Sequence, residues 1–195
     1  MKLRALLMAA GRGSRFGGLK QLAEVSGQPM VTRSLAVYQQ VLGNQVSLVL
    51  GCQAATVAQS LADTVAVIHA KRWQQGLGAS IGDAIKQLPA DTSHVLIGLA
   101  DQVAIQTGDL KRLMDASQQH PDKMIAAFYQ GQVGAPVIFP RRYFADLKQL
   151  NEDKGAKSIL QQHSQNLIAV ELSNASIDID TSEQLNSCAN SKNSN

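Results

Sequence analysis

Seven short apolar runs, rich in valine, isoleucine and leucine, alternate along this chain with longer amphipathic segments. Each run has the length of one buried strand, and the runs cover residues 3–9, 46–50, 65–69, 94–99, 123–129, 134–139 and 166–171. The segments between them have the apolar spacing of helices over residues 29–42, 53–62, 79–88, 107–119 and 153–162. Strands that alternate with helices in this way predict an α/β fold with a mainly parallel sheet between two layers of helices.

One connection departs from this alternation. The runs at 123–129 and 134–139 are separated by only a few residues, and Gly131 and Gly134 flank a turn between them. A parallel pair of strands needs a long crossover, whereas an antiparallel pair is joined by a short turn. The spacing therefore predicts a local antiparallel hairpin within the parallel sheet.

The chain has the length of one domain. Its 195 residues show neither an internal repeat nor a linker, and 45% of them are hydrophobic, which is enough for a sizeable core. We expect one domain over residues 1–186. The residues after Leu185 are almost all polar, so we expect a disordered tail over residues 187–195.

Composition excludes several classes of protein. The sequence lacks a secretory cleavage site, and no apolar run approaches the ~20 residues that cross a bilayer, so we expect a cytoplasmic protein with no membrane partner. The isoelectric point is near 9.0. Aromatic residues make up only 4% of the chain, however, and no basic stripe with interleaved aromatics is present, which argues against nucleic acid as a partner. A small anionic substrate accounts for the charge.

The residue types that most often bind metals or act as nucleophiles form no pattern. Cys52 and Cys188 are isolated thiols, too few for a disulfide framework or a zinc site. The four histidines lack metal-ligand spacing and form no catalytic triad with serine or cysteine; they are His69, His94, His120 and His163. We assign none of these residues a chemical role.

A glycine-rich basic loop follows the first apolar run directly. It reads Gly-Arg-Gly-Ser-Arg-Phe-Gly-Gly over residues 11–18 and leads to Lys20. Glycines let backbone N–H groups approach an anion, and Arg12, Arg15 and Lys20 supply charge that can follow a triphosphate. A dinucleotide fingerprint would need glycine at Phe16, and the Gly-Lys-Ser/Thr of a P-loop is missing. The loop predicts a nucleotide phosphate site of a different kind.

The distribution of charge favours this interpretation over an ordinary strand-to-helix turn with solvated arginines, which would also be glycine-rich. Residues 1–40 hold six cations against Glu24 alone, whereas the whole chain has a formal net charge of only +3. The positive charge is therefore concentrated around the loop.

Carboxylates follow two other segments. Asp101 comes just after the run at 94–99, at the edge where an open α/β sheet binds its ligand. Asp178 and Asp180 stand at alternate positions of an extended segment, so both point to one face and one of them can meet Asp101. Two carboxylates together with phosphate oxygens suit Mg²⁺. The alternatives are a strand-end cap for Asp101 and a helix N-cap for Asp180.

A second glycine-rich stretch opens a helix after the run at 65–69. Its small residues, Gly76 and Gly78 among them, let a flat base rest against the backbone while main-chain amides and Ser80 read the edge of the base. The alternative is a plain helix entry with Ser80 near the cap. Trp73, which precedes this stretch, is more typical of a core or rim aromatic than of a stacking platform.

Together these segments resemble the molybdenum cofactor nucleotidyltransferase family (MobA-like NTP transferases), most closely its molybdopterin cytidylyltransferase branch. The resemblance covers residues 3–186. The opening pattern of the family matches Met8-Ala9-Ala10-Gly11-Arg12-Gly13-Ser14-Arg15-Phe16-Gly17 and Lys20. Later patterns match residues 76–81, 99–102, 134–139, 153–156 and 178–181. One position departs from the family, because Val103 stands where many members have proline.

The resemblance implies a Rossmann-like three-layer domain of the nucleotide-diphospho-sugar transferase type. It also implies transfer of CMP from MgCTP to the phosphate of molybdopterin, with release of pyrophosphate. CTP is implied because the cytidine-specific branch has Ala-Ala-Gly where the guanylyltransferase branch typically has Ala-Gly-Gly. The implied nucleotide-binding residues are Ala9, Ala10, Gly11, Arg12, Gly13, Arg15, Lys20, Gly76, Gly78 and Ser80.

The resemblance further implies roles in catalysis. Arg15 and Lys20 would hold the β- and γ-phosphates, while Asp101 and Asp180, or Asp178 in its place, would hold Mg²⁺. The acceptor side would be formed by residues 134–140 with Lys154, Lys157 and Ser158. A recipient molybdoenzyme is an implied partner. The alternatives are a guanylyltransferase, a CTP-dependent transferase for another phosphorylated acceptor, and a non-catalytic protein that delivers the cofactor.

Overall fold

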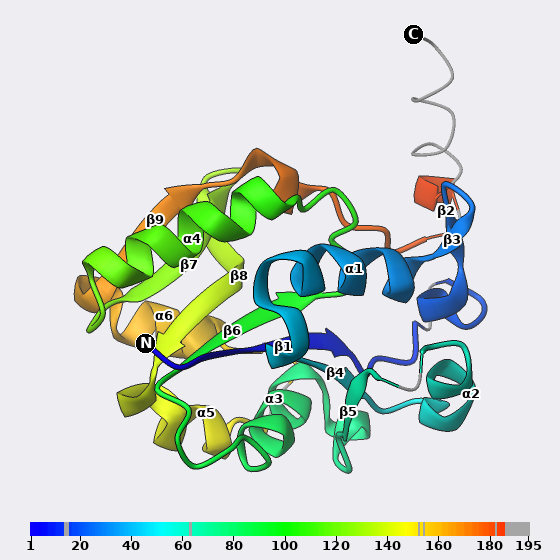
Figure 1. Ribbon diagram of the computed structural model, residues 1–195, viewed down its shortest axis with the longest axis horizontal. Coiled ribbons are helices and arrows are strands. Elements are labelled where there is room, and N and C mark those ends of the chain that lie inside the picture. Colours follow the sequence, from blue (N-terminus) through cyan, green and yellow to red (C-terminus); the bar gives the residue numbers. More distant parts are fainter. Residues whose placement is uncertain (14–15, 63, 152, 154, 182, 186–195) are drawn as a thin grey trace, which may run out of the picture.

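The chain forms a seven-stranded sheet with helices on both faces (Figure 1). The computed structural model describes residues 1–13, 16–62, 64–151, 153, 155–181 and 183–185. The strands of the sheet are β1 (Leu3–Ala9), β4 (Val46–Leu50), β5 (Ala66–His69), β6 (His94–Leu99), β7 (Met124–Tyr129), β8 (Gln132–Pro140) and β9 (Leu167–Glu171). A separate small hairpin consists of β2 (Glu24–Val25) and β3 (Gln28–Pro29).

The α-helices lie between these strands in the sequence. They are α1 (Met30–Leu42), α2 (Ala54–Gln59), α3 (Leu77–Ile85), α4 (Thr107–Gln119), α5 (Phe144–Gln149) and α6 (Lys157–Gln162). Short 3₁₀ helices are η1 (Lys20–Leu22), η2 (Gly43–Gln45), η3 (Trp73–Gln75), η4 (Arg141–Tyr143), η5 (Ser164–Asn166) and η6 (Ser173–Ser176). Among the described residues, none of the helices combines the length and the apolar character that a membrane span requires.

The strand order is β5-β4-β1-β6-β8-β7-β9. β1 pairs in parallel with both β4 and β6, whereas β8 pairs antiparallel with β6 and with β7. The turn between β7 and β8 is made by Gln130 and Gly131, whose φ angles of 50° and 75° are those of a two-residue hairpin loop. This confirms the predicted mainly parallel sheet with a local antiparallel hairpin.

Alternate residues of the strands enter two separate cores. Along β1, Ala5 and Leu7 pack against α1, α2 and α4, while Leu6 and Met8 pack against α3, α5 and α6. All four side chains are at most 4% exposed. β1 is apolar at every position except Arg4, and a central strand of this kind lies between two helical layers, as the α/β prediction requires.

The structure departs from the sequence prediction in its short elements. The predicted helix at 153–162 begins only at Lys157, because Gly155 has a φ of +59° and interrupts the helical path. Helix α5 and the β2–β3 hairpin were not predicted, since elements of six and two residues carry too little periodicity. The predicted tail at 187–195 lies outside the described residues.

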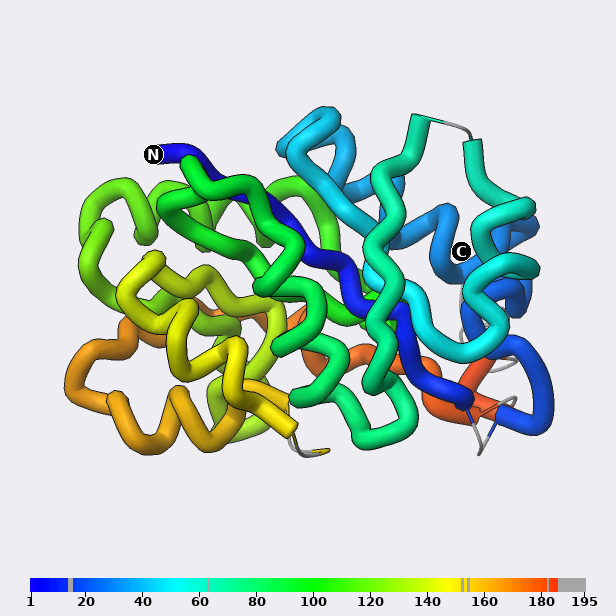
Figure 2. The backbone as a smooth tube through the Cα atoms, turned by 90° about the horizontal axis from the view of Figure 1, so that it is seen from below, coloured from blue at the N-terminus to red at the C-terminus, as the bar shows by residue number. Residues whose placement is uncertain are grey.

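Strand order reverses direction at β1, because the chain goes from β1 to β4 on one side and later returns to β6 on the other. Such a switch point leaves a crevice beyond the carboxyl ends of the two central strands. Figure 2 shows the red C-terminal segment lying beside the far end of the blue strand β1. The segments singled out from the sequence therefore meet at this edge of the sheet.

Candidate active site

The glycine-rich loop leaves the end of β1 and leads back to η1. The Phe16 N–H donates to the Gly13 carbonyl at 2.8 Å, and Gly13 has a φ of +62°. A Cβ at Gly13 would lie 2.9 Å from the Cβ of Lys20, so both the backbone angle and the close approach require glycine. Ser14 and Arg15, and with them the predicted role of Arg15, lie outside the described residues.

Gln21 fixes this loop to the sheet. Its Nε2 donates to the carbonyl of Ala9 at 3.0 Å and to the carbonyl of Gly11 at 2.7 Å, and the residue is buried. The side-chain amide thus ties the end of β1 to the start of the loop. Sequence reasoning missed Gln21 because a single glutamine in a loop belongs to no motif.

Lys20, Asp101 and Asp180 form an ionic cluster, which we call the carboxylate cluster. Lys20 Nζ lies 2.7 Å from Asp101 Oδ2 and 2.7 Å from Asp180 Oδ1, and the lysine side chain is only 12% exposed. Burial alone would lower the pKa of Lys20, but the two carboxylates outweigh it and raise this pKa above its ordinary value. Lys20 is therefore held as a cation at the crevice.

A buried isoleucine brings Asp180 to the cluster. The Ile179 N–H donates to the Asp101 carbonyl at 3.2 Å, and the fully buried Ile179 side chain packs with Val25, Met30 and Val103. The pKa of the neighbouring Asp178 is raised, mainly by burial and further by the charges of Asp180 and Asp101. Asp180, not Asp178, is the residue paired with Lys20 among the described contacts.

Asp180 is not the N-cap of a helix, the alternative that the sequence left open. The Gln184 N–H donates to Thr181 Oγ1 at 3.3 Å, and Gln184 Oε1 accepts from the Thr181 N–H at 2.9 Å. These reciprocal bonds are a capping box with Thr181 in the capping position. The Asp180 carboxylate is left to bond with Lys20, while its backbone N–H also donates to Gln184 Oε1.

Val103 has a local reason to differ from the proline of the family pattern. Its N–H donates to the Asp101 carbonyl at 2.9 Å, a bond that proline cannot make. Gln102 ties the same loop to two other segments, because its Nε2 donates to the carbonyls of Ala135 and Ala175. The backbone around Asp101 is therefore fixed by hydrogen bonds from both sides.

The carboxylate cluster has the chemistry to take part in holding a divalent cation. Asp101 Oδ1 is buried and has no hydrogen-bond partner among the described residues, so one of its oxygens retains full acceptor capacity. No group of three or more His, Cys, Asp or Glu suited to a metal occurs within the described ranges. A magnesium ion here would therefore complete its shell with water or with oxygens from a bound ligand.

A cavity of about 520 Å³ opens between the end of β1 and the start of α3. It is lined by Ala10, Gly11, Arg12, Trp73, Gln74, Gln75, Gly76, Leu77, Ser80 and Asp153. Ser80 Oγ donates to the Gly76 carbonyl at 3.1 Å, so its hydroxyl can still accept a bond from a ligand. Gly78 is buried in the first turn of α3 and does not line this cavity.

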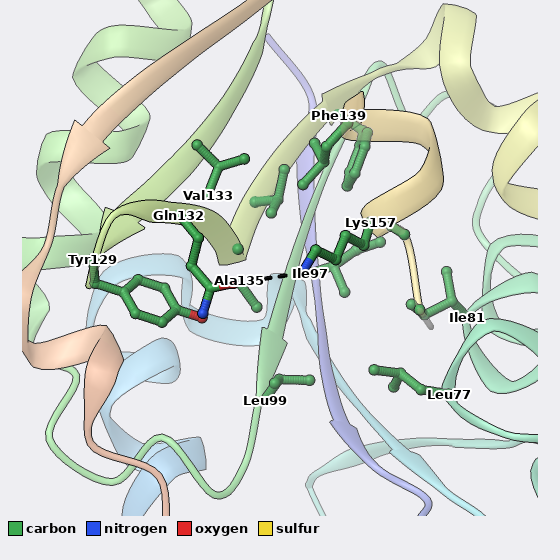
Figure 3. Close-up of a pocket in the computed structure, with 15 residues that line it drawn as sticks. Leu77, Ile81, Ile97, Leu99, Tyr129, Gln132, Val133, Ala135, Phe139 and Lys157 are labelled. Atoms are coloured by element: carbon green, nitrogen blue, oxygen red, sulfur yellow. Dashed lines mark hydrogen bonds between the residues drawn. The ribbon is translucent and has the colours of Figure 1, made fainter. Parts of the chain in front are cut away.

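An apolar cavity of about 230 Å³ lies beside β8, with Leu77 and Leu99 in its wall (Figure 3). Most of its wall is aliphatic or aromatic, and its polar side chains are Tyr129, Gln132 and Lys157. Lys157 Nζ donates to Gln132 Oε1 at 3.4 Å, and these two side chains point toward each other. Burial, followed by the charges of Asp178 and Asp101, raises the pKa of Tyr129.

The predicted acceptor-side residues, 134–140 with Lys154, Lys157 and Ser158, separate into four groups. Pro136, Ile138 and Pro140 do not line the apolar cavity, and Ile138 packs in the core on the opposite face of the sheet. Those that line the apolar cavity are Gly134, Ala135, Val137, Phe139 and Lys157. Ser158 instead lines a separate depression beside α5. Lys154 lies outside the described residues.

Leu77 connects the parts of the site. A third cavity of about 250 Å³ contains Lys20, Asp101 and Asp180, and Leu77 lines this cavity as well as the other two. Its N–H lies 3.4 Å from Asp153 Oδ1 and its side chain packs against Gly155. The start of α3 therefore forms the common wall of three adjoining spaces.

This sheet order, with a glycine-rich loop and a lysine–carboxylate cluster at the switch point, defines a Rossmann-like nucleotidyltransferase fold. The model of the family described as the MobA-like NTP transferase domain matches residues 5–167, and the chain belongs to this family. A curated relative, the bifunctional protein GlmU of Legionella pneumophila, is 29% identical over 140 residues, which are 70% of this chain and 30% of the relative. The chain spans less than a third of the length of such relatives.

Solved structures are similar over nearly the whole chain. Rv0371c from Mycobacterium tuberculosis is 25% identical with a TM-score of 0.85, covering 97% of this chain and 98% of that one. The structure of the same protein in complex with manganese is 23% identical with a TM-score of 0.81, and the match covers the same shares of the two chains. Molybdopterin-guanine dinucleotide biosynthesis protein A from Archaeoglobus fulgidus is 13% identical with a TM-score of 0.76, again over 97% and 98% of the two chains.

Proposed function

We propose that this protein is a molybdenum cofactor cytidylyltransferase, which transfers CMP from CTP to the phosphate of molybdopterin and releases pyrophosphate. The observation that carries the proposal is that the cavity of the carboxylate cluster shares lining residues with two other cavities. One cavity adjoins the glycine-rich loop and the other is apolar. A nucleotide and an acceptor can therefore reach the same charged centre from two different cavities.

The reaction needs no nucleophile from the protein. A phosphate monoester is already largely anionic near neutral pH, so its oxygen attacks the α-phosphorus of CTP while the bond to the bridging oxygen of the β-phosphate breaks. The protein contributes alignment and charge neutralisation. This requirement agrees with a site whose ionisable groups are a lysine and carboxylates.

Lys20 is the described cation best placed for the phosphates. Its ammonium reaches the cavity beneath the loop, and in the free protein Asp101 and Asp180 hold it there. We assign Lys20, together with Arg15, to the β- and γ-phosphates, where their charge stabilises the departing pyrophosphate.

Asp101 and Asp180 are the proposed ligands of Mg²⁺. The buried, unpartnered oxygen of Asp101 supports this assignment, as does the manganese complex of the similar Mycobacterium protein. When bound, the ion supplies neutralisation of charge at the transferring phosphate.

Two features support the choice of substrates. Ala10 lines both the cavity of the carboxylate cluster and the cavity beside Trp73, at the position where the guanylyltransferase branch typically has glycine. This fits CTP better than the larger guanine nucleotide of the Ala-Gly-Gly branch. The apolar cavity fits the flat ring of a pterin, with Lys157 at its mouth for an anionic group. A recipient molybdoenzyme is the proposed partner for the product.

Pyrophosphate release tests the proposal. Purified protein, Mg²⁺ and molybdopterin are supplied with CTP, GTP or ATP in parallel, and we expect release with CTP alone. Asp101→Asn should lose most of this turnover while it keeps the thermal unfolding midpoint close to that of the wild type. Ala10→Gly should raise the use of GTP relative to CTP. Release with GTP alone would instead identify a guanylyltransferase, and silence with all three nucleotides would favour another acceptor or a delivery role.

A further inference from the structure

We propose that Trp73 is the surface on which the base of the bound nucleotide stacks, and that Arg12 covers this ring until the base replaces it. The inference rests on the proposed function in one respect only, that the ligand is a nucleotide. It concerns the base rather than the phosphates. The tryptophan is the only one in the chain, which makes the inference directly measurable.

Trp73 has the setting of a surface that binds a flat ring. It is half-buried, packs at the edge of the apolar core beneath α3 and lines the cavity of about 520 Å³. Partial exposure alone is usual for a tryptophan. Trp73, however, lines a cavity that contains few other apolar side chains.

The ring is held firmly against the neighbouring strand end. A Cβ at Gly51, just after β4, would lie 2.6 Å from Trp73 Cγ and 2.7 Å from the Ala10 carbonyl, so only glycine permits this packing. The preceding residue is fixed as well, because Arg72 donates from its N–H and from Nε to Asp83, each at 2.8 Å. The position of Trp73 is therefore set before a ligand binds, which lowers the entropic cost of binding.

The Arg12 guanidinium lies over one face of this ring. Its Cζ lies 5.8 Å from the centre of the Trp73 ring, although the arginine belongs to the exposed glycine-rich loop. A tryptophan face that attracts a guanidinium also stacks well with a nucleobase. The cation–π contact thus marks the face at which a base would lie.

The geometry of the loop links this face to the phosphates. Ala10 and Gly11 line both the Trp73 cavity and the cavity of the carboxylate cluster. A triphosphate bound along the loop near Lys20 would therefore have its nucleoside directed toward Trp73. Once the base displaces the Arg12 guanidinium, that charge becomes available to the phosphates.

Stacking is largely indifferent to the identity of the base, because every base has a π face. Trp73 should therefore strengthen the binding of CTP and GTP by similar factors and leave the ratio of their affinities unchanged. Selectivity would come from the shape of the cavity near Ala10. This separates the role of Trp73 from that of a residue that reads the edge of the base.

Tryptophan fluorescence tests the inference without an acceptor. Titration of the wild-type protein with CTP or CMP should quench the emission of Trp73 to saturation, whereas inorganic pyrophosphate, which has no base, should not. Arg12→Ala should shift the emission of the free protein to longer wavelength, since the ring loses its cover, and should keep the quenching by CTP.

Calorimetry supplies the second readout. Trp73→Leu should weaken the binding of CTP by about tenfold to a hundredfold, the range expected for one lost base stack, while pyrophosphate binds as in the wild type. Trp73→Phe should restore most of the affinity, which guards against misfolding of the leucine variant. CTP that binds by calorimetry without quenching, or Trp73→Leu with wild-type affinity, would overturn the inference and leave the proposed function standing. Quenching by CTP in a protein that never releases pyrophosphate would retain the inference and overturn the proposed function.

Discussion

Replacing Lys20 by methionine should destabilise the free protein. The change keeps most of the side-chain stem but removes the ammonium that lies 2.7 Å from each of Asp101 and Asp180. The two carboxylate oxygens are at most about 5.4 Å apart, which corresponds to a repulsion of about 3 kcal/mol at an effective dielectric constant of about 20. The carboxylates are 28% and 43% exposed, so screening reduces the effect, and we expect a loss of about 2 kcal/mol at pH 7.

Urea unfolding followed by circular dichroism measures this loss as a lower midpoint at unchanged slope. Lys2→Met is the matched control, because it removes a lysine from a pair with Asp91 that is exposed on both sides. Such a surface pair contributes little, and the control should keep the midpoint of the wild type. A larger fall in midpoint for Lys20→Met than for Lys2→Met would show that the effect comes from the buried position of the carboxylate cluster and not from the loss of one positive charge.

Divalent metal provides the decisive step of this experiment. Mg²⁺ or Mn²⁺ should raise the unfolding midpoint of Lys20→Met more than that of the wild type, because the carboxylates of the variant have lost the lysine that neutralises them. Lys20→Met with the wild-type midpoint would refute the electrostatic reasoning. A loss of stability that neither metal reduces would refute the assignment of Asp101 and Asp180 as metal ligands.

Three other substitutions test the packing and charge of the fold. The Tyr38 hydroxyl is buried without a hydrogen-bond partner among the described residues, so Tyr38→Phe should keep the free energy of unfolding or raise it by up to about 1 kcal/mol; a marked loss would contradict this. Gly51→Ala should cost about 1–3 kcal/mol and shift the Trp73 emission, and an unchanged spectrum and stability would contradict the close packing. Burial would raise the pKa of Asp83, but bonds from Arg72 outweigh it and hold this pKa below its ordinary value. The stabilising effect of the Asp83 carboxylate is therefore present above about pH 4 and is lost as the pH falls through the lower folded pKa. Asp83→Asn should cost about 2 kcal/mol at pH 7 and progressively less as the pH falls below about 4; a pH-independent cost would contradict this.

The sheet could be predicted from the sequence because its strands are buried on both faces. Runs such as 46–50 and 94–99 are apolar at nearly every position, and only a strand between two helical layers has that pattern at that length. The short elements could not be predicted in this way. Helix α5 owes its helical conformation to the packing of Phe144 and Leu147 under the sheet, a tertiary effect that no six-residue window contains.

The candidate site was predictable to the extent that a topological rule could be applied. Residues just beyond the ends of parallel strands meet at one edge of the sheet, and this rule predicts Asp101 as a site residue from the sequence alone. The pairing of Lys20 with both Asp101 and Asp180 was not foreseen, because it depends on the buried anchor Ile179 and on the path of the loop. Gln21 was missed for the same reason, since its bonds become visible only once the loop is folded.

Transfer of label tests the central claim most directly. The protein is incubated with Mg²⁺, molybdopterin and CTP that carries a radioactive α-phosphate, and the pterin product is separated by chromatography. The proposed reaction predicts that label moves into a cytosine dinucleotide of the pterin, and that Asp101→Asn abolishes this transfer. Label that stays in CTP, or that appears only as free CMP while labelled GTP is transferred, would contradict it.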